Sequence, residues 1–191
     1  MNSNLFIISG ANGSGKSTFA NEILKIYPHI EFVNADNIAK GLSEDLNSVK
    51  VQAGKIAINR MNELIDLDKS FIIETTLSGS YTKKIIEKAK LKKYNIMLTY
   101  VFVDNVNICI DRVKSRFVKG GHDVPVEDII RRYYKSINNF MEYIKIVDKW
   151  ELFYNGIESS TLVAKGQKDI VSINNDRLYS DFLNRIKNER R

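Results

Sequence analysis

The sequence predicts an α/β protein with a mostly parallel central sheet covered by helices on both faces. Two observations lead to this class. Short, continuous apolar runs alternate with longer segments of helical periodicity, which is the pattern of parallel strands buried between their connecting helices. The first apolar run, at residues 5–9, is followed at once by the glycine-rich stretch GANGSGKST at residues 10–18.

Each apolar run is expected to form a strand, and each periodic segment a helix. The strand at 5–9 leads into a helix at 15–27, which ends before Pro28 because proline breaks the helical hydrogen-bond ladder. The next helix, at 48–66, has apolar residues near one face at Val51, Ile58, Met61 and Ile65. The other expected elements are strands at 31–34, 70–74 and 96–103 and helices at 81–92, 106–117 and 126–143.

The C-terminal part is expected to add antiparallel strands. Runs at 151–154 and 161–165 predict a hairpin through Asn155-Gly156, a pair of turn-forming residues. A strand at 170–173 and a closing helix complete the chain. The 191 residues contain no repeat and no proline-rich linker, so we expect a single domain over 1–191.

Composition and charge narrow the functional classes. The net charge is +6, and much of the excess lies at 83–93 and 177–191, which favours solvated helix faces over a nucleic-acid partner. Cys109 is the only cysteine, so we expect a buried core thiol, no disulfide and no zinc site. No apolar run is long enough to span a membrane, and no secretory signal is recognisable, so we expect a cytoplasmic protein.

The stretch at residues 10–18 has the spacing of a P-loop, which makes the expected fold a P-loop NTPase three-layer sandwich. Its glycines let successive N–H groups face one phosphate, and the following helix directs its positive end at the same anion. Lys16 would reach the outer phosphates of ATP, and the Ser17 hydroxyl would bind Mg²⁺. The expected ATP-binding residues are Gly10, Ala11, Asn12, Gly13, Ser14, Gly15, Lys16, Ser17 and Thr18.

The remaining sequence favours a kinase over a motor or a switch. No ABC signature and no Asn-Lys-x-Asp guanine-recognition motif occurs in order. A kinase needs a carboxylate that takes a proton from the acceptor hydroxyl. Asp36 follows the strand at 31–34, which we place beside the first strand, so it is expected at the edge of the sheet where ligands bind. Glu74 ends the third strand at the same edge and is followed by Thr75 and Thr76.

A kinase also needs cations on a mobile lid, to neutralise the transferring phosphoryl group. We expect a helical lid over about residues 112–135. Arg112 and Arg116 lie one helical turn apart and are the expected catalytic arginines. The substrate-binding residues of the lid would be His122, in a glycine-rich hinge, and Arg131 and Arg132 beyond it. Because Arg131 and Arg132 are adjacent, they cannot both face one site.

Each of these residues also has a purely structural interpretation. Asp36 could cap the segment that follows it, and Glu74 could be a buried hydrogen-bond acceptor. The four arginines could be solvated, and His122 could be an ordinary loop residue. Aromatic side chains near the C-terminal half are expected to pack in the core and not to stack on bases; they are Tyr133, Tyr134, Phe140, Tyr143 and Trp150.

Taken together, the motifs resemble the zeta-toxin family of P-loop kinases, in particular its short chromosomal members described as predicted ATPases. The resemblance spans residues 5 to about 165. It is carried, in order, by the stretches GANGSGKST at 10–18, FVNAD at 32–36, FIIETTLS at 71–78 and the segment 116–134 around GGHDVP. Only the first stretch is generic to P-loop proteins, and the combination is more specific.

The resemblance implies an ATP- and Mg²⁺-dependent kinase whose acceptor is the amino-sugar 3′-hydroxyl of UDP-N-acetylglucosamine, with an antitoxin protein as a candidate partner. It implies that Lys16 and Ser17 hold ATP and Mg²⁺, Asp36 is the base, Glu74 with Thr75 or Thr76 contacts the acceptor, and Arg112 or Arg116 acts from the lid. The toxins carry a second lid arginine shortly before a proline, whereas this chain has His122 before Pro125.

Three functions stay open on the sequence. The first is a kinase acting on a hydroxyl of a small molecule, such as a UDP-sugar. The second is an ATP-binding regulatory or nucleic-acid-binding protein that uses the basic surface. The third is a polynucleotide 5′-hydroxyl kinase, which performs the same chemistry on a different acceptor.

Overall fold

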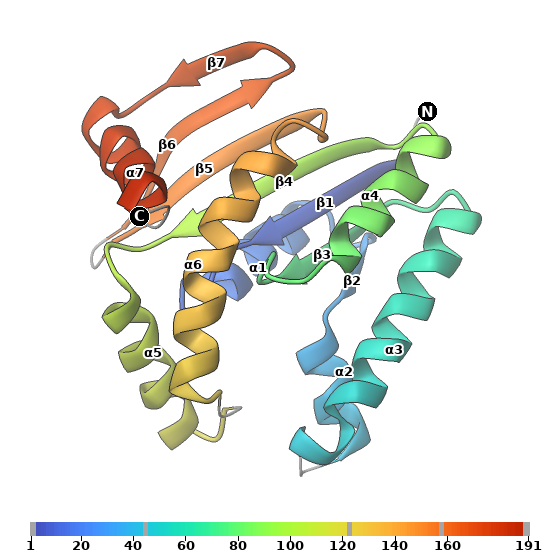
Figure 1. Cartoon of the computed structure of the whole chain (residues 1–191). Coiled ribbons are helices and arrows are strands. Elements are labelled where there is room, and N and C mark those ends of the chain that lie inside the picture. Colours follow the sequence, from blue (N-terminus) through green and yellow to red (C-terminus); the bar gives the residue numbers. More distant parts are fainter. Residues whose placement is uncertain (1–2, 44–45, 122–123, 157–158, 189–191) are drawn as a thin grey trace.

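The structure, a computed structural model, describes residues 3–43, 46–121, 124–156 and 159–188. Within these residues seven strands form one sheet, and helices lie on both of its faces (Figure 1). The predicted α/β class with a mostly parallel sheet is confirmed. The strands are β1 Asn4–Ser9, β2 Glu31–Val33, β3 Phe71–Thr75, β4 Asn95–Phe102, β5 Lys149–Asn155, β6 Ser160–Gln167 and β7 Ile170–Ile173.

The helices connect and cover these strands. They are α1 Lys16–Ile26, α2 Ala35–Leu42, α3 Leu46–Asp66, α4 Tyr81–Leu91, α5 Val106–Val118, α6 Val126–Tyr143 and α7 Asp176–Asn188. Among the described residues, no helix is sufficiently long and apolar to cross a membrane.

The strand order is β2-β3-β1-β4-β5-β6-β7, with parallel pairs as far as β5 and antiparallel pairs beyond it. Our prediction that the second strand lies beside the first is therefore wrong. Strand β3 lies between them, and its residue Glu74 is in register with Ile8 of β1. The consequence is that Glu74, and not Asp36, lies on the strand next to β1, from which the P-loop begins.

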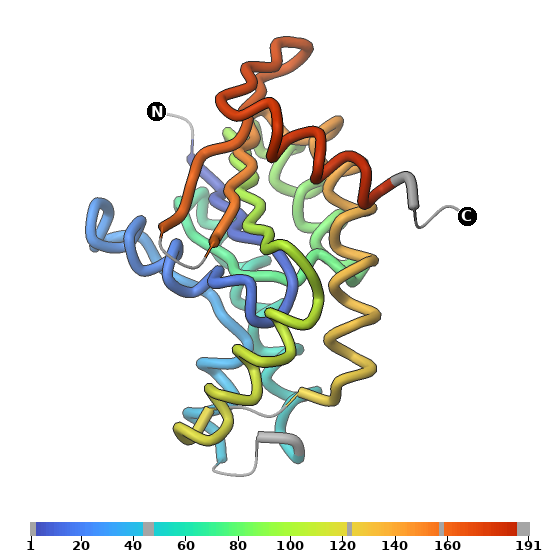
Figure 2. The backbone as a smooth tube through the Cα atoms, turned by 90° about the vertical axis from the view of Figure 1, so that its left-hand side faces the viewer, coloured from blue at the N-terminus to red at the C-terminus, as the bar shows by residue number. Residues whose placement is uncertain are grey.

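Two apolar cores form, one on each face of the sheet. A small core lies under α1, where Phe19 and Ile23 pack against Ile8 and Ile72. The larger core lies on the opposite face and is covered by the other long helices. Figure 2 shows α1 on one side of the sheet and α6 and α7 on the other. The sheet is thus buried on both faces near β1, which explains the continuous apolar character of that strand.

Two local predictions need correction. Helix α2 has no counterpart among the predicted elements, because it is short and follows its strand without a glycine or proline. In α3, Val51 is not on the buried face, since it is 73% exposed. The buried face of α3 includes the small residues Ala53 and Ala57, together with Leu64 and Ile65. A search for large apolar residues easily misses buried alanines.

The C-terminal hairpin packs onto the main core through Trp150. Its indole is buried and meets the ring of Phe140 edge-on, with ring centroids 5.8 Å apart. The indole lies flat against β6 at Gly166, where an added Cβ would be 2.4 Å from the indole Nε1. The strand pairing places Asn155 opposite Ser160, so the connection is longer than the predicted two-residue turn and includes residues 157 and 158, which lie outside the described residues.

Two glycine substitutions should change stability in opposite directions. Gly166→Ala should destabilise the fold by about 1–3 kcal/mol, because its methyl group would overlap the Trp150 ring. Gly54→Ala should stabilise it by about 0.5–1 kcal/mol, because Gly54 is inside α3 and its added Cβ would meet no described atom within 4 Å beyond the adjacent backbone of α3. Urea unfolding midpoints at unchanged slope measure both effects. Equal effects of the two substitutions would contradict this account.

Candidate active site

The P-loop connects β1 to α1 and is packed too tightly for side chains at two of its glycines. A Cβ at Gly10 would be 2.2 Å from the backbone oxygen of Val101, and one at Gly13 would be 2.5 Å from that of Cys109. Both glycines also have positive φ angles. The loop is therefore held between β4 and α5. Cys109 is buried there, as predicted, and its burial raises the pKa of the thiol to about 11.

The side chain of Lys16 folds back onto the P-loop. Its Nζ donates a hydrogen bond of 2.8 Å to the backbone oxygen of Ala11 and lies 3.9 Å from Oε1 of Glu74. Burial lowers the pKa of Lys16, while the charges of Glu74 and Asp36 raise it and Arg116 lowers it further. The ammonium group is therefore poorly compensated, and an anion bound in the loop would stabilise its charged form. This arrangement fits the phosphates of ATP.

The carboxylate of Glu74, on β3, forms hydrogen bonds with residues of two other segments, α1 and the residue before α2. Its Oε2 accepts hydrogen bonds from Ser17 Oγ at 2.9 Å and from Asn34 Nδ2 at 3.0 Å. Its side chain is only 10% exposed. Glu74 is thus a buried hydrogen-bond acceptor, as its structural interpretation has it, but one of its two donors, Ser17, belongs to the predicted site. The other donor, Asn34, was not among the predicted site residues.

The same group of atoms fits Mg²⁺. The hydroxyl of Ser17 and the carboxylate of Glu74 are hard oxygen donors, which this ion prefers. No group of three or more His, Cys, Asp or Glu side chains within the described ranges could hold a metal ion. A cation here would have to complete its ligands with phosphate oxygens and water, as Mg²⁺ does when it binds with a nucleotide.

Asp36 lies in the first turn of α2 and is exposed. It does not cap this helix. The cap is Asn34, whose Oδ1 accepts hydrogen bonds from the backbone N–H groups of Asp36 and Asn37 at 2.8 and 3.1 Å. Because the charge of Asp36 acts on Lys16, its carboxylate lies within electrostatic range of the P-loop while it stays accessible to a substrate.

The two arginines of α5 have different surroundings. Arg112 Nη2 donates to the backbone oxygens of Asn155 and Gly156, at 3.4 and 3.1 Å. Asn155 in turn donates from Nδ2 to the backbone oxygen of Ser14, at 2.8 Å. Arg112 therefore holds the end of β5 against the P-loop, whereas Arg116 lies near enough to Lys16 to lower its pKa. Asn155 was not among the predicted site residues, since only tertiary contact reveals it.

The two adjacent arginines of α6 diverge, as their spacing requires. Arg132 Nη1 lies 3.4 Å from Oδ1 of Asn12 in the P-loop, and its Nη2 donates to Asp128 at 3.0 Å. Arg131 pairs with the other oxygen of Asp128 and is 58% exposed, against 18% for Arg132. The structure thus brings Arg132, and not Arg131, to the P-loop.

The remaining predicted site residues either form hydrogen bonds with nearby residues in the chain or lie outside the described residues. Thr75 Oγ1 accepts from the backbone N–H of Leu77, and the Thr76 hydroxyl lies 2.8 Å from that of Ser78. Both threonines therefore support the turn after β3. His122 lies outside the described residues.

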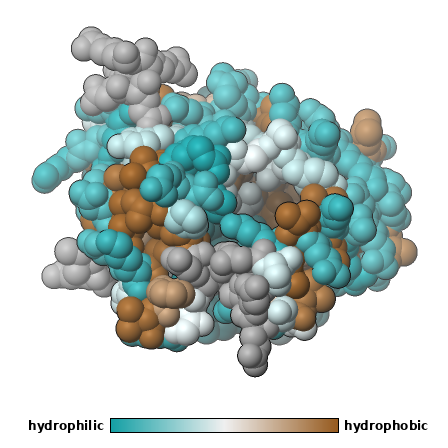
Figure 3. Space-filling model, turned by 60° about the horizontal axis from the view of Figure 1, so that its bottom comes forward, coloured by the Kyte–Doolittle hydropathy of each residue, from teal (hydrophilic) through white to brown (hydrophobic). Residues whose placement is uncertain are grey.

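The helices on either side of the P-loop extend beyond the sheet as two arms, α2 with α3 and α5 with α6 (Figure 1). Figure 3 views the molecule from the side on which these arms end, where hydrophilic and hydrophobic side chains surround a hollow. The predicted lid forms part of the second arm.

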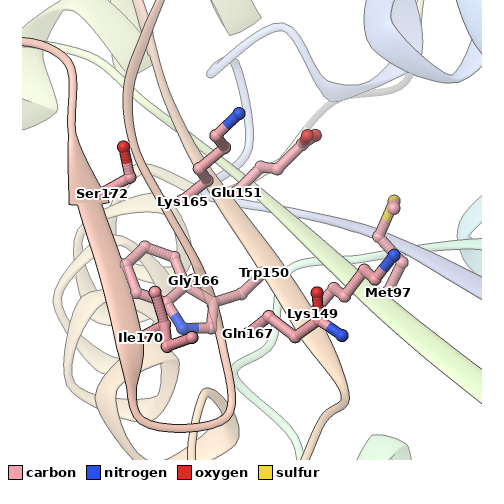
Figure 4. A pocket seen from close by; sticks show the side chains of 9 residues that line it. All are labelled: Met97, Lys149, Trp150, Glu151, Lys165, Gly166, Gln167, Ile170 and Ser172. Carbon is pink, nitrogen blue, oxygen red and sulfur yellow. The ribbon is translucent and has the colours of Figure 1, made fainter.

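A separate cavity of about 370 Å³ lies over strands β4 to β7. Glu151 and Lys165 extend from its neighbouring strands in the same direction, with Lys149 and Gln167 beside them (Figure 4). Partial burial raises the pKa of Glu151. No P-loop residue lines this cavity, so it takes no part in the candidate site.

Comparison with known proteins gives the family. The model of the zeta toxin family matches residues 2–155. A relative from Haemophilus influenzae, described as an uncharacterized protein, is 31% identical over 129 residues, which cover 65% of this chain and 88% of the relative.

Solved structures share the fold. A chain of the AvrRxo1-ORF1:-ORF2 complex with ATP superposes with a TM-score of 0.81 at 18% identity, over 95% of this chain and 63% of that chain. The present chain therefore spans less than two thirds of that protein. A chain of the PezAT chromosomal toxin–antitoxin system of Streptococcus pneumoniae gives a TM-score of 0.67 at 16% identity, over 98% of this chain and 87% of its own length.

Replacing the two arginines of α6 should separate their roles. Arg132→Ala should weaken ATP binding about 10-fold or more, because a cation at the mouth of the loop is lost. Arg131→Ala should change the affinity less than about 2-fold, because its guanidinium is exposed and pairs outside the loop. Calorimetric titration with ATP and Mg²⁺ measures both affinities. An equal loss in the two variants would refute the distinction.

Proposed function

Because the chain belongs to the zeta toxin family, we propose that it transfers the γ-phosphoryl group of ATP to a hydroxyl group of a small molecule. Family membership and the fold support a P-loop phosphotransferase. The observation that carries the proposal is the contact of Lys16, Ser17 and Glu74 at the sheet edge, with the carboxylate of Asp36 near enough for its charge to act on Lys16.

We assign the nucleotide side of the reaction to the P-loop and the groups around it. Lys16 binds the outer phosphates. Ser17 and Glu74 would hold Mg²⁺, which would supply positive charge to neutralise the phosphates. Arg116 and Arg132 supply further positive charge from the second arm.

We assign the acceptor side to Asp36. Its carboxylate is exposed on the first turn of α2, where an incoming hydroxyl can reach it. As general base it takes the hydroxyl proton while the oxygen attacks the γ-phosphorus. The first arm, α2 with α3, therefore holds the acceptor, and the second arm covers the phosphates.

For the acceptor we propose UDP-N-acetylglucosamine, phosphorylated on its amino-sugar 3′-hydroxyl. The support is the resemblance of residues 10–18, 32–36 and 71–78 to the zeta toxins. We also propose an antitoxin protein as partner, because similar folds occur in the AvrRxo1-ORF1:-ORF2 complex and in PezAT. The runner-up is a polynucleotide 5′-hydroxyl kinase. As expected from the sequence, Tyr133, Phe140, Tyr143 and Trp150 are buried in the core and offer no surface for base stacking. The same expectation is wrong for Tyr134, which is 41% exposed.

Asp36→Asn tests the proposed chemistry. The variant should transfer phosphate at least about 100-fold more slowly, because the proton acceptor is lost. Its affinity for ATP should change by less than about 2-fold, because the P-loop contacts remain. The assay combines protein, ATP, Mg²⁺ and UDP-N-acetylglucosamine, and mass spectrometry detects a UDP-sugar heavier by one phosphate.

Asp169→Asn, in the exposed turn between β6 and β7, is the matched control and should keep wild-type turnover. If the wild type makes no product but still binds ATP, the UDP-sugar is wrong, and other hydroxyl acceptors, oligonucleotides among them, are screened. If Asp36→Asn turns over at the wild-type rate, Asp36 is not the base.

A further inference from the structure

We infer that Asn34 is a positioning residue that sets the two carboxylates of the site, Glu74 and Asp36, relative to each other. The inference rests on the proposed function, because it gives these carboxylates their roles. Asn34 follows β2 directly and is buried. Both ends of its side-chain amide are used, and each end serves a different carboxylate-bearing residue.

The nitrogen end orients Glu74. Asn34 Nδ2 donates to Glu74 Oε2 at 3.0 Å, and this same oxygen accepts the Ser17 hydroxyl at 2.9 Å. The other oxygen, Oε1, is then left facing Lys16 Nζ at 3.9 Å. A carboxylate on a flexible side chain has several rotamers available. The amide donor selects the one in which Glu74 faces both Ser17 and Lys16.

The oxygen end places Asp36. Asn34 Oδ1 caps α2 by accepting from the backbone N–H groups of Asp36 and Asn37. The cap fixes where α2 begins, and Asp36 lies in its first turn. The direction of the Asp36 side chain relative to the P-loop therefore depends on the same amide group that orients Glu74.

This dual use explains the residue type. Asp and Ser cap helices about as well as Asn does, but an ionised Asp has no donor for Glu74, and a Ser hydroxyl is too short to replace both ends of an amide. Asn105 offers an internal comparison. It caps α5 in the same way, by accepting from the N–H groups of Asn107 and Ile108, but its amide nitrogen donates to no described residue.

The test compares Asn34→Asp and Asn34→Ser with the control Asn105→Asp. Both changes at position 34 keep a capping oxygen, so thermal midpoints should stay within a few degrees of the wild type. Both remove the donor to Glu74. We expect kcat to fall about 10- to 100-fold, and the Mg²⁺ concentration for half-maximal rate to rise about 10-fold, as when a group that orients a metal ligand is lost. KM for ATP at saturating Mg²⁺ should change less than about 3-fold.

A loss of the cap alone would not produce this split between kcat and KM, and Asn105→Asp should match the wild type in every measurement. Wild-type kcat and Mg²⁺ response in either folded variant at position 34 would overturn the inference. Calorimetric titration of each protein with Mg²⁺ in the presence of ATP gives a second measurement that needs no acceptor. If the wild type phosphorylates nothing, the proposed function fails, while an unchanged Mg²⁺ affinity in the variants would refute the role of Asn34 separately.

Discussion

The buried ammonium group of Lys16 is the constraint on which the rest of the site depends. It lies in the curve of the P-loop with one backbone acceptor at 2.8 Å, and Glu74 is 3.9 Å away. Burial disfavours its charge more than these neighbours favour it, so its pKa is lowered. A site with this imbalance is preorganised for an anion, since the anion restores the charged form that burial penalises.

The sheet supplies the geometry that makes this possible. Parallel strands end at a common edge, and the register between β1 and β3 sets Glu74 beside Ile8, one residue before the P-loop strand ends at Ser9. A carboxylate near the end of this adjacent strand can therefore reach both Lys16 and Ser17. Asp36 lies one strand further away, on a separate helix, and is exposed. In the proposed reaction, strand order thus divides the two carboxylates between nucleotide and acceptor.

Distant segments of the chain also meet at the P-loop. Arg112 holds the end of β5, and Asn155 at that end bonds to Ser14. From α6 in the same arm, Arg132 reaches Asn12. The loop is therefore bonded at two of its residues to side chains that lie more than a hundred positions later. Movement of this arm on nucleotide binding would act directly on the loop, because the Arg132 contact is a hydrogen bond to a loop side chain.

The sequence by itself determined the fold class, nearly every strand and helix, and the P-loop, because these follow from local periodicity and from short motifs with strict spacing. It also indicated Asp36 and Glu74 as residues at strand ends. Only the tertiary structure decided that β3, and not β2, lies beside β1, since strand order depends on packing between segments far apart in the chain. For the same reason, periodicity could not choose between Arg131 and Arg132, nor reveal Asn34 and Asn155, whose roles are hydrogen bonds to residues 40 and 141 positions away.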